Sequence, residues 1–183
     1  MSKPTSICVF CGSRPGKLPI YMDLATRMGR CLAENDIRLV YGGGGVGLMG
    51  AAARACDEAG GQVLGIIPKF LCGREAALDA GQLEIVDTLH ARKARMAECS
   101  DAFVVLPGGL GTLEEVIEIL SWINLKEYQH KVVLLDEDGY WDRFFELISH
   151  TIDHGFTDEI VLEQAMRAHS PEQALLKLGI LGA

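Results

Sequence analysis

Residues 37–50 read IRLVYGGGGVGLMG, an apolar run of strand length that passes through glycines directly into a helix-like segment. We expect a strand at Ile37–Tyr41 and a helix from Gly47 to Ala59. This order of strand, glycine-rich loop and helix is typical of a βαβ unit, in which the loop leaves the carboxyl end of a parallel strand. The first N–H groups of such a helix can bind an anion, so the stretch predicts both a fold class and a place for a ligand.

The same alternation extends along the chain in both directions. Further strands are expected at Ser6–Cys11, Val63–Ile67, Leu83–Val86, Ala102–Leu106, Val132–Leu135 and Ala165–His169. Helices are expected over Pro19–Glu34, Leu89–Cys99, Thr112–Leu125 and Trp141–His154, with a last one opened by Ser170-Pro171. Right-handed crossovers between such strands produce an α/β, Rossmann-like, doubly wound and mostly parallel sheet with helices on both faces. A length of 183 residues favours a single domain spanning 1–183.

Composition narrows the range of partners. A formal net charge of −8 argues against a nucleic-acid partner, because a broad footprint draws on clustered Lys and Arg. The longest apolar runs are of strand length, so no membrane span of about 20 residues is expected. The N-terminus lacks the long apolar run of a signal peptide, which predicts a cytoplasmic protein. The six cysteines are then expected to be reduced, with Cys8 and Cys11 on opposite faces of one strand.

The first glycine-rich loop has the spacing G-x-G-x-x-G at Gly42, Gly44 and Gly47. It follows the second expected strand, however, and no acidic residue near Gly60–Pro68 could hold a ribose, so NAD is not expected. Two interpretations stay open. The glycines, Gly43 and Gly44 among them, serve tight turning and packing, or they let a substrate approach the backbone.

A second loop, LPGGLGTLEE at 106–115, also lies between an expected strand and an expected helix. Gly108, Gly109 and Gly111 would allow a close backbone approach, and Thr112 adds a hydroxyl at the helix start, so a phosphate would fit. Neither loop continues into G-K-[ST], which argues against triphosphate chemistry with magnesium. Thr112 and Glu115 also match the capping box T-x-x-E, so Glu115 could cap the helix, act on a bond near the phosphate, or do both.

A basic cluster of Arg92, Lys93 and Arg95 lies on the expected helix 89–99. On an acidic protein it could bind a phosphate or orient a carboxylate, and the alternative is an ordinary solvated helix face. His150 and His154 have i, i+4 spacing but lack the glutamate of H-E-x-x-H, so no metal site is expected.

Taken together, these motifs resemble the LOG family, the cytokinin riboside 5′-monophosphate phosphoribohydrolases that are often labelled lysine decarboxylases. The resemblance covers nearly the whole chain. It rests on CVFCGS at Cys8–Ser13, the glycine-rich run Tyr41–Gly50, IIPK at Ile66–Lys69, HARKARM at His90–Met96 and, most specifically, P-G-G-x-G-T-x-x-E at Pro107–Glu115.

The resemblance implies hydrolysis of the N-glycosidic bond of a nucleoside 5′-monophosphate, such as a cytokinin riboside 5′-monophosphate or AMP, to a free base and ribose 5-phosphate. Arg92 and Glu115 are implied as the catalytic pair. The implied substrate contacts are Gly12, Ser13, Gly43, Gly44, Glu75, Lys93, Gly108, Gly109, Gly111, Thr112, Glu114 and Ser121. A homodimer with active sites near the subunit interface is implied as well, and the reaction requires no metal or organic cofactor.

Two other functions compete with this hypothesis. The same fold and loops could bind a nucleotide or a molybdenum cofactor without cleaving it, as some relatives of the family resemble carrier proteins. A lysine decarboxylase that uses pyridoxal phosphate would need a lysine placed to form a Schiff base, and Lys93 is the lysine near the expected site. The arginines beside Lys93 and the missing framework for that cofactor argue against the second alternative.

Overall fold

The computed structural model describes residues 5–72, 81–126 and 130–181. Within these ranges the chain forms a seven-stranded sheet in the order β4-β3-β2-β1-β5-β6-β7, and every strand pair in it is parallel. The strands are β1 (Ser6–Phe10), β2 (Arg38–Tyr41), β3 (Val63–Pro68), β4 (Gln82–Val86), β5 (Ala102–Val105), β6 (Val132–Leu135) and β7 (Ala165–Ala168). The prediction of an α/β, doubly wound parallel sheet is confirmed.

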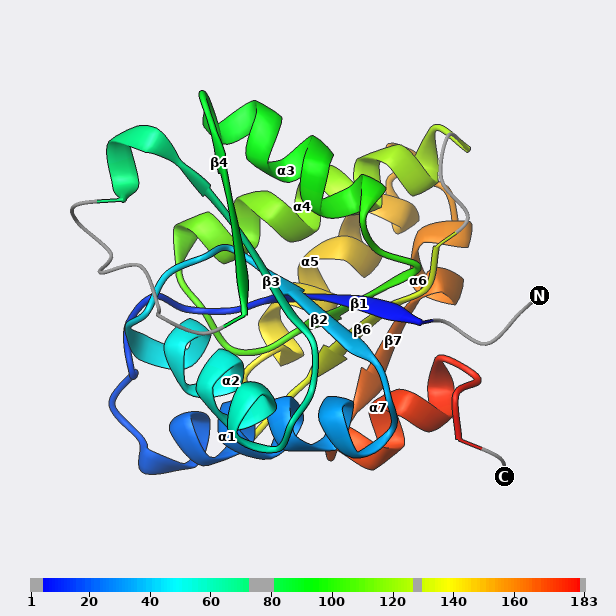
Figure 1. The fold of residues 1–183 in the computed structure, drawn as a ribbon. Helices are drawn as coiled ribbons and strands as arrows, with labels where there is room; N and C mark the ends of the chain where they lie inside the picture. Colours follow the sequence, from blue (N-terminus) through cyan, green and yellow to red (C-terminus); the bar gives the residue numbers. More distant parts are fainter. Residues whose placement is uncertain (1–4, 73–80, 127–129, 182–183) are drawn as a thin grey trace.

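Helices cover both faces of this sheet (Figure 1). They are α1 (Pro19–Glu34), α2 (Gly47–Glu58), the short 3₁₀ helix η1 (Lys69–Leu71), α3 (Leu89–Glu98), α4 (Leu110–Asn124), α5 (Asp142–Asp153), α6 (Ile160–Gln164) and α7 (Pro171–Lys177). One core cluster joins the sheet to α1, α2 and α7, and a second joins its other face to α3, α4, α5 and α6. The chain is thus a three-layer sandwich.

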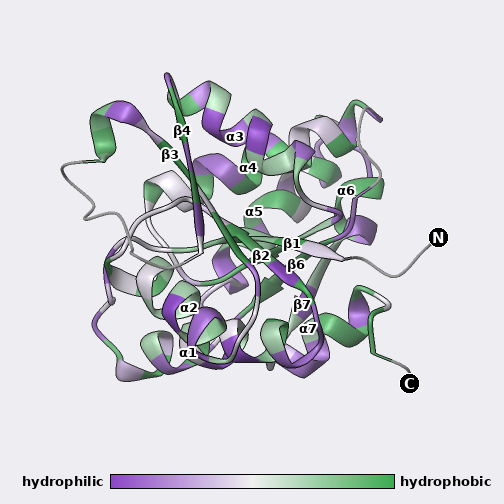
Figure 2. Ribbon diagram, viewed as in Figure 1, coloured by the Kyte–Doolittle hydropathy of each residue, from purple (hydrophilic) through white to green (hydrophobic). Residues whose placement is uncertain are grey.

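Burial on both sides explains the composition of the strands. All five residues of β1 are buried, as are those of β5 and β6, and hydrophobic residues follow one another along much of the central strands (Figure 2). Cys8 packs in the cluster with α3–α6 and Cys11 in the cluster with α1, α2 and α7, so the predicted alternation is confirmed. Burial, reinforced by the nearby Glu115 carboxylate, raises the pKa of both thiols.

The predicted start of α4 is wrong by two residues, and the observed start bears on the role of Glu115. The helix begins at Leu110 with Gly109 as its N-cap, and no side chain caps it. Thr112 is therefore the third residue of the helix, and Glu115 lies in its second turn. The proposed capping box does not form, because its threonine is not in the N-cap position. Glycines at 109 and 111 hid this boundary, since glycine is a poor guide to where a helix begins.

Strand order sets the position of the ligand site. The chain starts at the central strand β1, proceeds outward to β4, and then returns to β5 on the other side of β1. In such sheets the loops after the two central strands diverge, and ligands bind outside the carboxyl ends of the strands at this switch point. Helix α6 was not predicted from the sequence. No helix in the described part of the chain is long and apolar enough to cross a membrane.

Candidate active site

A cavity of about 580 Å³ lies at the switch point between β1 and β5. Its volume is in the range of small-molecule sites. The cavity is lined by the loops after β1 and β5, the starts of α1 and α2, one residue of α3, the first turns of α4 and one residue from the loop after β6. The lining residues are Cys11, Gly12, Ser13, Arg14, Gly16, Tyr21, Leu48, Met49, Arg92, Pro107, Gly108, Gly109, Leu110, Gly111, Thr112, Glu115 and Tyr140.

The loop after β5 forms an open anion cradle. A methyl group at Gly109 or Gly111 would have no neighbour within 4 Å, so space for a ligand lies directly over this backbone. At Gly108 a methyl would instead lie 2.1 Å from the Thr112 hydroxyl, so this glycine is required by packing. The first N–H groups of α4 have no carbonyl partner within the helix and lie at its positive end. Together these features suit a phosphate group.

The loop after β2 serves packing more than ligand contact. Gly43 and Gly44 are buried and do not line the cavity. Gly43 has a φ of +77°, which favours glycine, and Gly47 at +59° packs against the backbone of Ser13 and Arg14. The N–H groups at the start of α2 donate to the Gly12 carbonyl at 3.0 and 3.4 Å, so they are not open to a phosphate.

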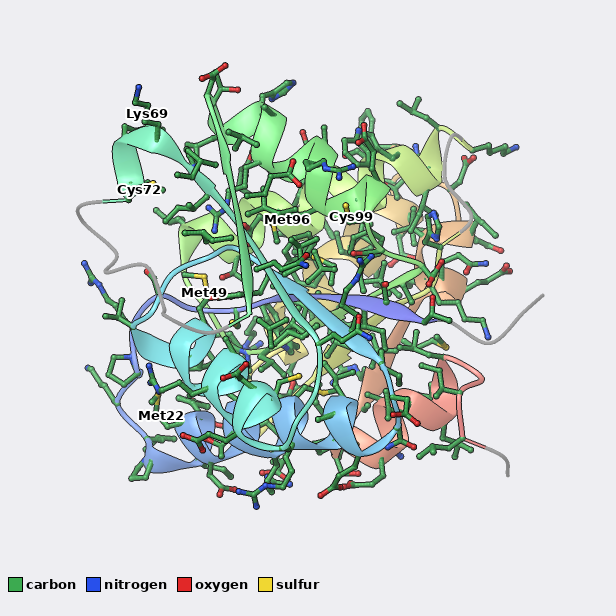
Figure 3. The ribbon with its side chains drawn as sticks, viewed as in Figure 1. Met22, Met49, Lys69, Cys72, Met96 and Cys99 are labelled. Atoms are coloured by element: carbon green, nitrogen blue, oxygen red, sulfur yellow. The ribbon has the colours of Figure 1, made fainter. Side chains whose placement is uncertain are left out.

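Residues at the start of α2 still reach the cavity. Leu48 and Met49 form part of its wall, and Figure 3 shows Met49 beside the sheet at the beginning of the helix. The Met49 sulfur lies 3.9 Å from Nη2 of Arg92. The glycine-rich loop therefore shapes the wall behind the arginine.

Arg92 projects from α3 into this wall and is only 7% exposed. Its Nη2 donates to the Gly42 carbonyl at 3.0 Å, and its Nη1 lies 4.0 Å from Oε1 of Glu115. Nε is buried and has no hydrogen-bond partner among the described residues. A buried guanidinium of this kind is expected to find an acceptor on a ligand or a water molecule. The solvated-face interpretation is therefore wrong for Arg92.

Glu115 faces Arg92 from α4 and is 9% exposed. Among the residues that line the cavity in the described part of the chain, it is the one carboxylate. The two charges attract each other across 4.0 Å, which is longer than a direct hydrogen bond. A carboxylate and a guanidinium thus share one end of the cavity, one to two helical turns from the anion cradle.

Lys93 lies next to Arg92, but its side chain points to the glutamates of α4 and not into the cavity. Its ammonium forms ion pairs with Glu114 and with Glu118, the latter at 3.0 Å, and it does not line the cavity. Burial lowers its pKa, but the hydrogen bonds to the two glutamates outweigh burial, so the pKa is raised. Lys93 is thus a charged link between α3 and α4.

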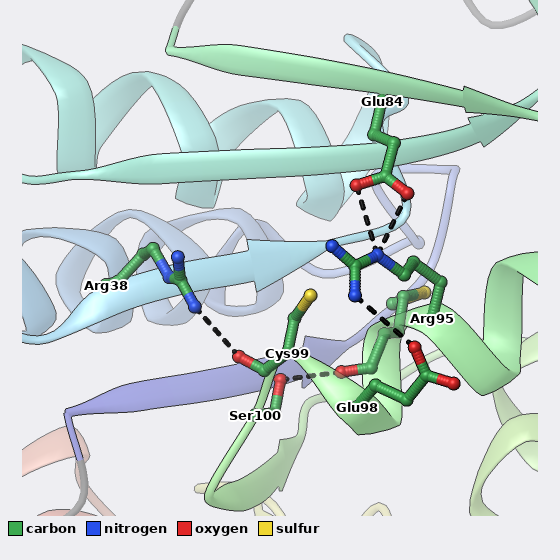
Figure 4. Close-up of polar contacts among 7 residues, drawn as sticks. Arg38, Glu84, Arg95, Glu98, Cys99 and Ser100 are labelled. Atoms are coloured by element: carbon green, nitrogen blue, oxygen red, sulfur yellow. Dashed lines mark hydrogen bonds and ion pairs between the residues drawn. The ribbon is translucent and has the colours of Figure 1, made fainter.

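Arg95 fixes α3 to the edge of the sheet (Figure 4). Its Nε donates to both oxygens of Glu84 on β4, at 2.9 and 3.1 Å, and Nη1 donates to Glu98 at 3.3 Å. Nearby, Nη2 of Arg38 donates to the Cys99 carbonyl at 3.1 Å, just after the helix ends. These contacts hold α3 in place, and Arg95 is not among the cavity residues.

The remaining predicted contacts are Gly12, Ser13, Ser121 and Glu75, and only the first two line the cavity among the described residues. Gly12 and Ser13 line the cavity, and Gly12 lies against the loop after β5, where its N–H donates to the Pro107 carbonyl at 3.1 Å. Ser121 is exposed, does not line the cavity, and donates to the Ile117 carbonyl at 2.8 Å. Glu75 lies outside the described residues.

Sequence reasoning missed the aromatic wall of the cavity, which consists of Tyr21 and Tyr140. Their rings meet edge to face at 5.8 Å. Tyr140 could have been found, because it follows the strand Val132–Leu135 in a sheet expected to be parallel. Its loop therefore opens at the same edge as the glycine-rich loops. Arg14 was missed as well, although it directly follows the predicted Gly12-Ser13 pair.

Comparison with known proteins identifies the family of the chain. The family model described as possible lysine decarboxylase matches residues 49–178. The chain is 42% identical over 178 residues to the cytokinin riboside 5′-monophosphate phosphoribohydrolase LOG3 of Arabidopsis thaliana, covering 97% of this chain and 83% of that protein. It is also 42% identical over 173 residues to the phosphoribohydrolase LOG of Oryza sativa subsp. japonica, covering 94% and 72%.

Among solved structures, the molybdenum cofactor binding protein of Rippkaea orientalis aligns with a TM-score of 0.73 at 26% identity. The alignment covers 98% of this chain and 97% of that one. The likeness supports the fold, whereas the sequence similarity is greater to the phosphoribohydrolases. On the family match and on 42% identity over nearly its whole length, the chain belongs to the LOG family, whose family model is described as possible lysine decarboxylase.

Proposed function

We propose that this protein hydrolyses the N-glycosidic bond of a nucleoside 5′-monophosphate, releasing the free base and ribose 5-phosphate. The observation that supports this most is the pairing of a buried Arg92 and Glu115 at one end of a cavity whose other end is an open anion cradle. The relatives named above are called phosphoribohydrolases that act on cytokinin riboside 5′-monophosphates. AMP and its N6-modified forms are the substrates to test first.

In this proposal the phosphate binds at the start of α4, over Gly109 and Gly111, where a ligand has room to contact the backbone. Free N–H groups at a helix N-terminus favour an anion. The ribose then extends toward Glu115, which places the glycosidic carbon near the carboxylate. Binding energy from the phosphate holds the reacting bond in position, although the phosphate takes no part in bond cleavage.

The chemical step breaks the bond between C1′ and the base nitrogen while a water oxygen forms a new bond to C1′. Positive charge develops on the ribose, and the Glu115 carboxylate stabilises it and accepts the proton of the attacking water. The departing base takes up a proton from solvent and Glu115 returns its proton to solvent, so the sum is one water consumed for each bond broken. Arg92 holds Glu115 by charge and offers its buried Nε to the substrate.

Burial of the pair supports this assignment. Both side chains are about nine-tenths buried, and electrostatic interactions are stronger in such surroundings than in water. Since no capping box forms at the start of α4, that structural explanation for Glu115 does not apply. Cys11 is a less suitable nucleophile, because its raised pKa keeps the thiol protonated.

The two competing functions fit the site less well. A carrier would need the anion cradle but has no evident use for a buried carboxylate beside the ligand, and a charge at that place is costly to keep. A Schiff base at Lys93 would require its amine to reach the cavity, whereas the amine is bound to Glu114 and Glu118 and is held in the protonated form by them.

We also propose that the protein is a homodimer, as the family resemblance implies. On α4 Ile117 is 41% exposed, Leu125 directly after the helix is 68% exposed, and on the edge strand β4 Ile85 is 59% exposed. Large apolar side chains left exposed in this way support a protein–protein interface. Because α4 also bears Glu115, an interface here would lie close to the active site.

The direct test is to incubate the purified protein with AMP and to separate the products. Hydrolysis predicts adenine and ribose 5-phosphate in equal amounts, increasing with time and enzyme concentration. Recovery of intact AMP, bound but not cleaved, would favour the carrier function instead.

A further inference from the structure

The turn after β6 holds Tyr140 in a fixed position beside the anion cradle. Asp136, at the end of the strand, is 3% exposed, and its two oxygens accept hydrogen bonds from the N–H groups of Gly139 and Trp141 at 2.8 and 2.9 Å. Trp141 is 1% exposed and anchors the turn in the core. Both chain neighbours of Tyr140 are thus tied to one buried carboxylate.

The Tyr140 side chain contacts the loop after β5. Its hydroxyl donates to the carbonyl oxygen of Gly108 at 2.6 Å, and its ring packs edge to face on Tyr21 and on Trp141. Tyr140 is 41% exposed and lines the cavity. The hydroxyl thus holds the loop that we assign to the phosphate by one of its carbonyl oxygens.

The hydrogen bond acts on the peptide that joins Gly108 to Gly109. With glycine on both sides, this peptide has more rotational freedom than any other residue pair would allow. In a planar trans peptide the C=O and N–H point in opposite directions, so fixing the Gly108 carbonyl also fixes the Gly109 N–H. A rotated peptide would present a carbonyl oxygen where an N–H now lies, and a carbonyl repels an anion.

We propose that Tyr140 is a positioning residue for the phosphate, which it serves by locking the Gly108–Gly109 peptide in its anion-binding orientation. This inference rests on the proposed function only in its choice of a phosphate ligand. Tyr140 acts through the backbone, so it is expected to affect binding of the phosphate group much more than the chemical step.

The test compares Tyr140→Phe, which keeps the ring and removes the hydroxyl, with the wild type. Dissociation constants are measured by calorimetry for AMP, inorganic phosphate and adenosine, with Glu115→Gln added to both proteins so that AMP is not consumed during the titration. We expect weaker binding of AMP and phosphate by about 3- to 10-fold, the equivalent of one ordinary hydrogen bond, with adenosine unchanged. KM for AMP should rise by the same factor, and kcat at saturation should stay within about 2-fold.

A matched control is Thr151→Val on α5, which removes another hydroxyl-to-carbonyl hydrogen bond, 2.8 Å to Ile148, together with a 2.8 Å contact to the Thr157 hydroxyl, away from the cavity residues. It should change none of the three constants. Unchanged AMP binding in Tyr140→Phe, or an equal loss for adenosine, would overturn the inference. If the wild type binds AMP without cleaving it, the proposed hydrolysis fails, but the binding comparison still decides the role of Tyr140. A wild type that binds neither AMP nor phosphate would overturn both.

Discussion

At the level of single residues, the proposed reaction depends on two side chains from different helices. Arg92 extends from α3 and Glu115 from α4, and their charged groups meet 4.0 Å apart in a buried position. Glu115 does not form a capping box, since α4 begins at Leu110. A change that removes its charge while keeping its shape should therefore separate chemistry from stability.

Glu115→Gln is expected to lower kcat by about 10²- to 10⁴-fold, the usual range for general acid–base catalysis. The melting temperature should change little, because glutamine keeps the volume of the side chain. Glu146→Gln is the control; Glu146 is exposed on α5 and pairs only with Arg143 in the described contacts, so kcat should not change. Wild-type turnover by Glu115→Gln would remove the carboxylate from the mechanism.

The same pair permits a test of whether the two residues act as a unit. Arg92→Ala should reduce turnover strongly, because Glu115 loses its partner and the substrate loses the Nε donor. Residues that act together give non-additive losses. The double variant should therefore be scarcely slower than the slower single variant, whereas losses that multiply would indicate two independent roles.

At the scale of elements, the glycine-rich loops place the helices that hold these side chains. A methyl group at Gly42 would lie 1.8 Å from Nη2 of Arg92, so alanine at this position must displace the guanidinium. Gly42→Ala should thus reduce kcat by at least about 10-fold with both catalytic residues intact. The matched change is Gly109→Ala, where a methyl meets nothing within 4 Å of protein but occupies the space of the phosphate.

The two glycine variants are expected to differ in kind. Steady-state kinetics should show a loss mainly in kcat for Gly42→Ala and mainly in KM for Gly109→Ala. Equal effects of both substitutions on kcat and KM would contradict the assignment of the loop after β2 to positioning Arg92 and of the loop after β5 to binding the phosphate.

The elements themselves could largely be predicted from the sequence. Proline at position 19, serine-proline at 170–171 and the strand-length apolar runs placed most helices and strands to within one residue or two of their observed bounds. The start of α4 could not be placed, because glycines at 109 and 111 are equally compatible with loop and helix. Helix α6 is only five residues long and was missed for that reason.

The site could be predicted only in part, because some of its contacts join residues that are far apart in the sequence. The P-G-G-x-G-T run lies within a few residues of its strand, so the local pattern identified it. The contact between Tyr140 and Gly108 joins positions 32 residues apart, and it depends on strand order, which no local pattern encodes. The same holds for Lys93, whose direction toward Glu118 follows from how α3 packs against α4.

At the scale of the whole molecule, the exposed apolar residues of α4 and β4 predict that two chains associate. Light scattering at micromolar concentration should return twice the chain mass of 19.9 kDa. Ile117→Glu, on a side chain 41% exposed, should convert the protein to a monomer by placing a charge in the interface. Leu176→Glu, 42% exposed on α7 across the sheet, is the matched control and should stay dimeric. A monomeric wild type would refute the proposed interface.

We expect the protein to cleave a nucleoside that it holds by the 5′-phosphate. The measurement that tests this expectation most directly is kcat/KM for base release from AMP and from adenosine under the same conditions. Since the anion cradle can contact only the first of these, we predict that AMP is cleaved at least about 10²-fold more efficiently, in line with two or more charge-assisted hydrogen bonds. Equal efficiency for the two substrates would contradict the account.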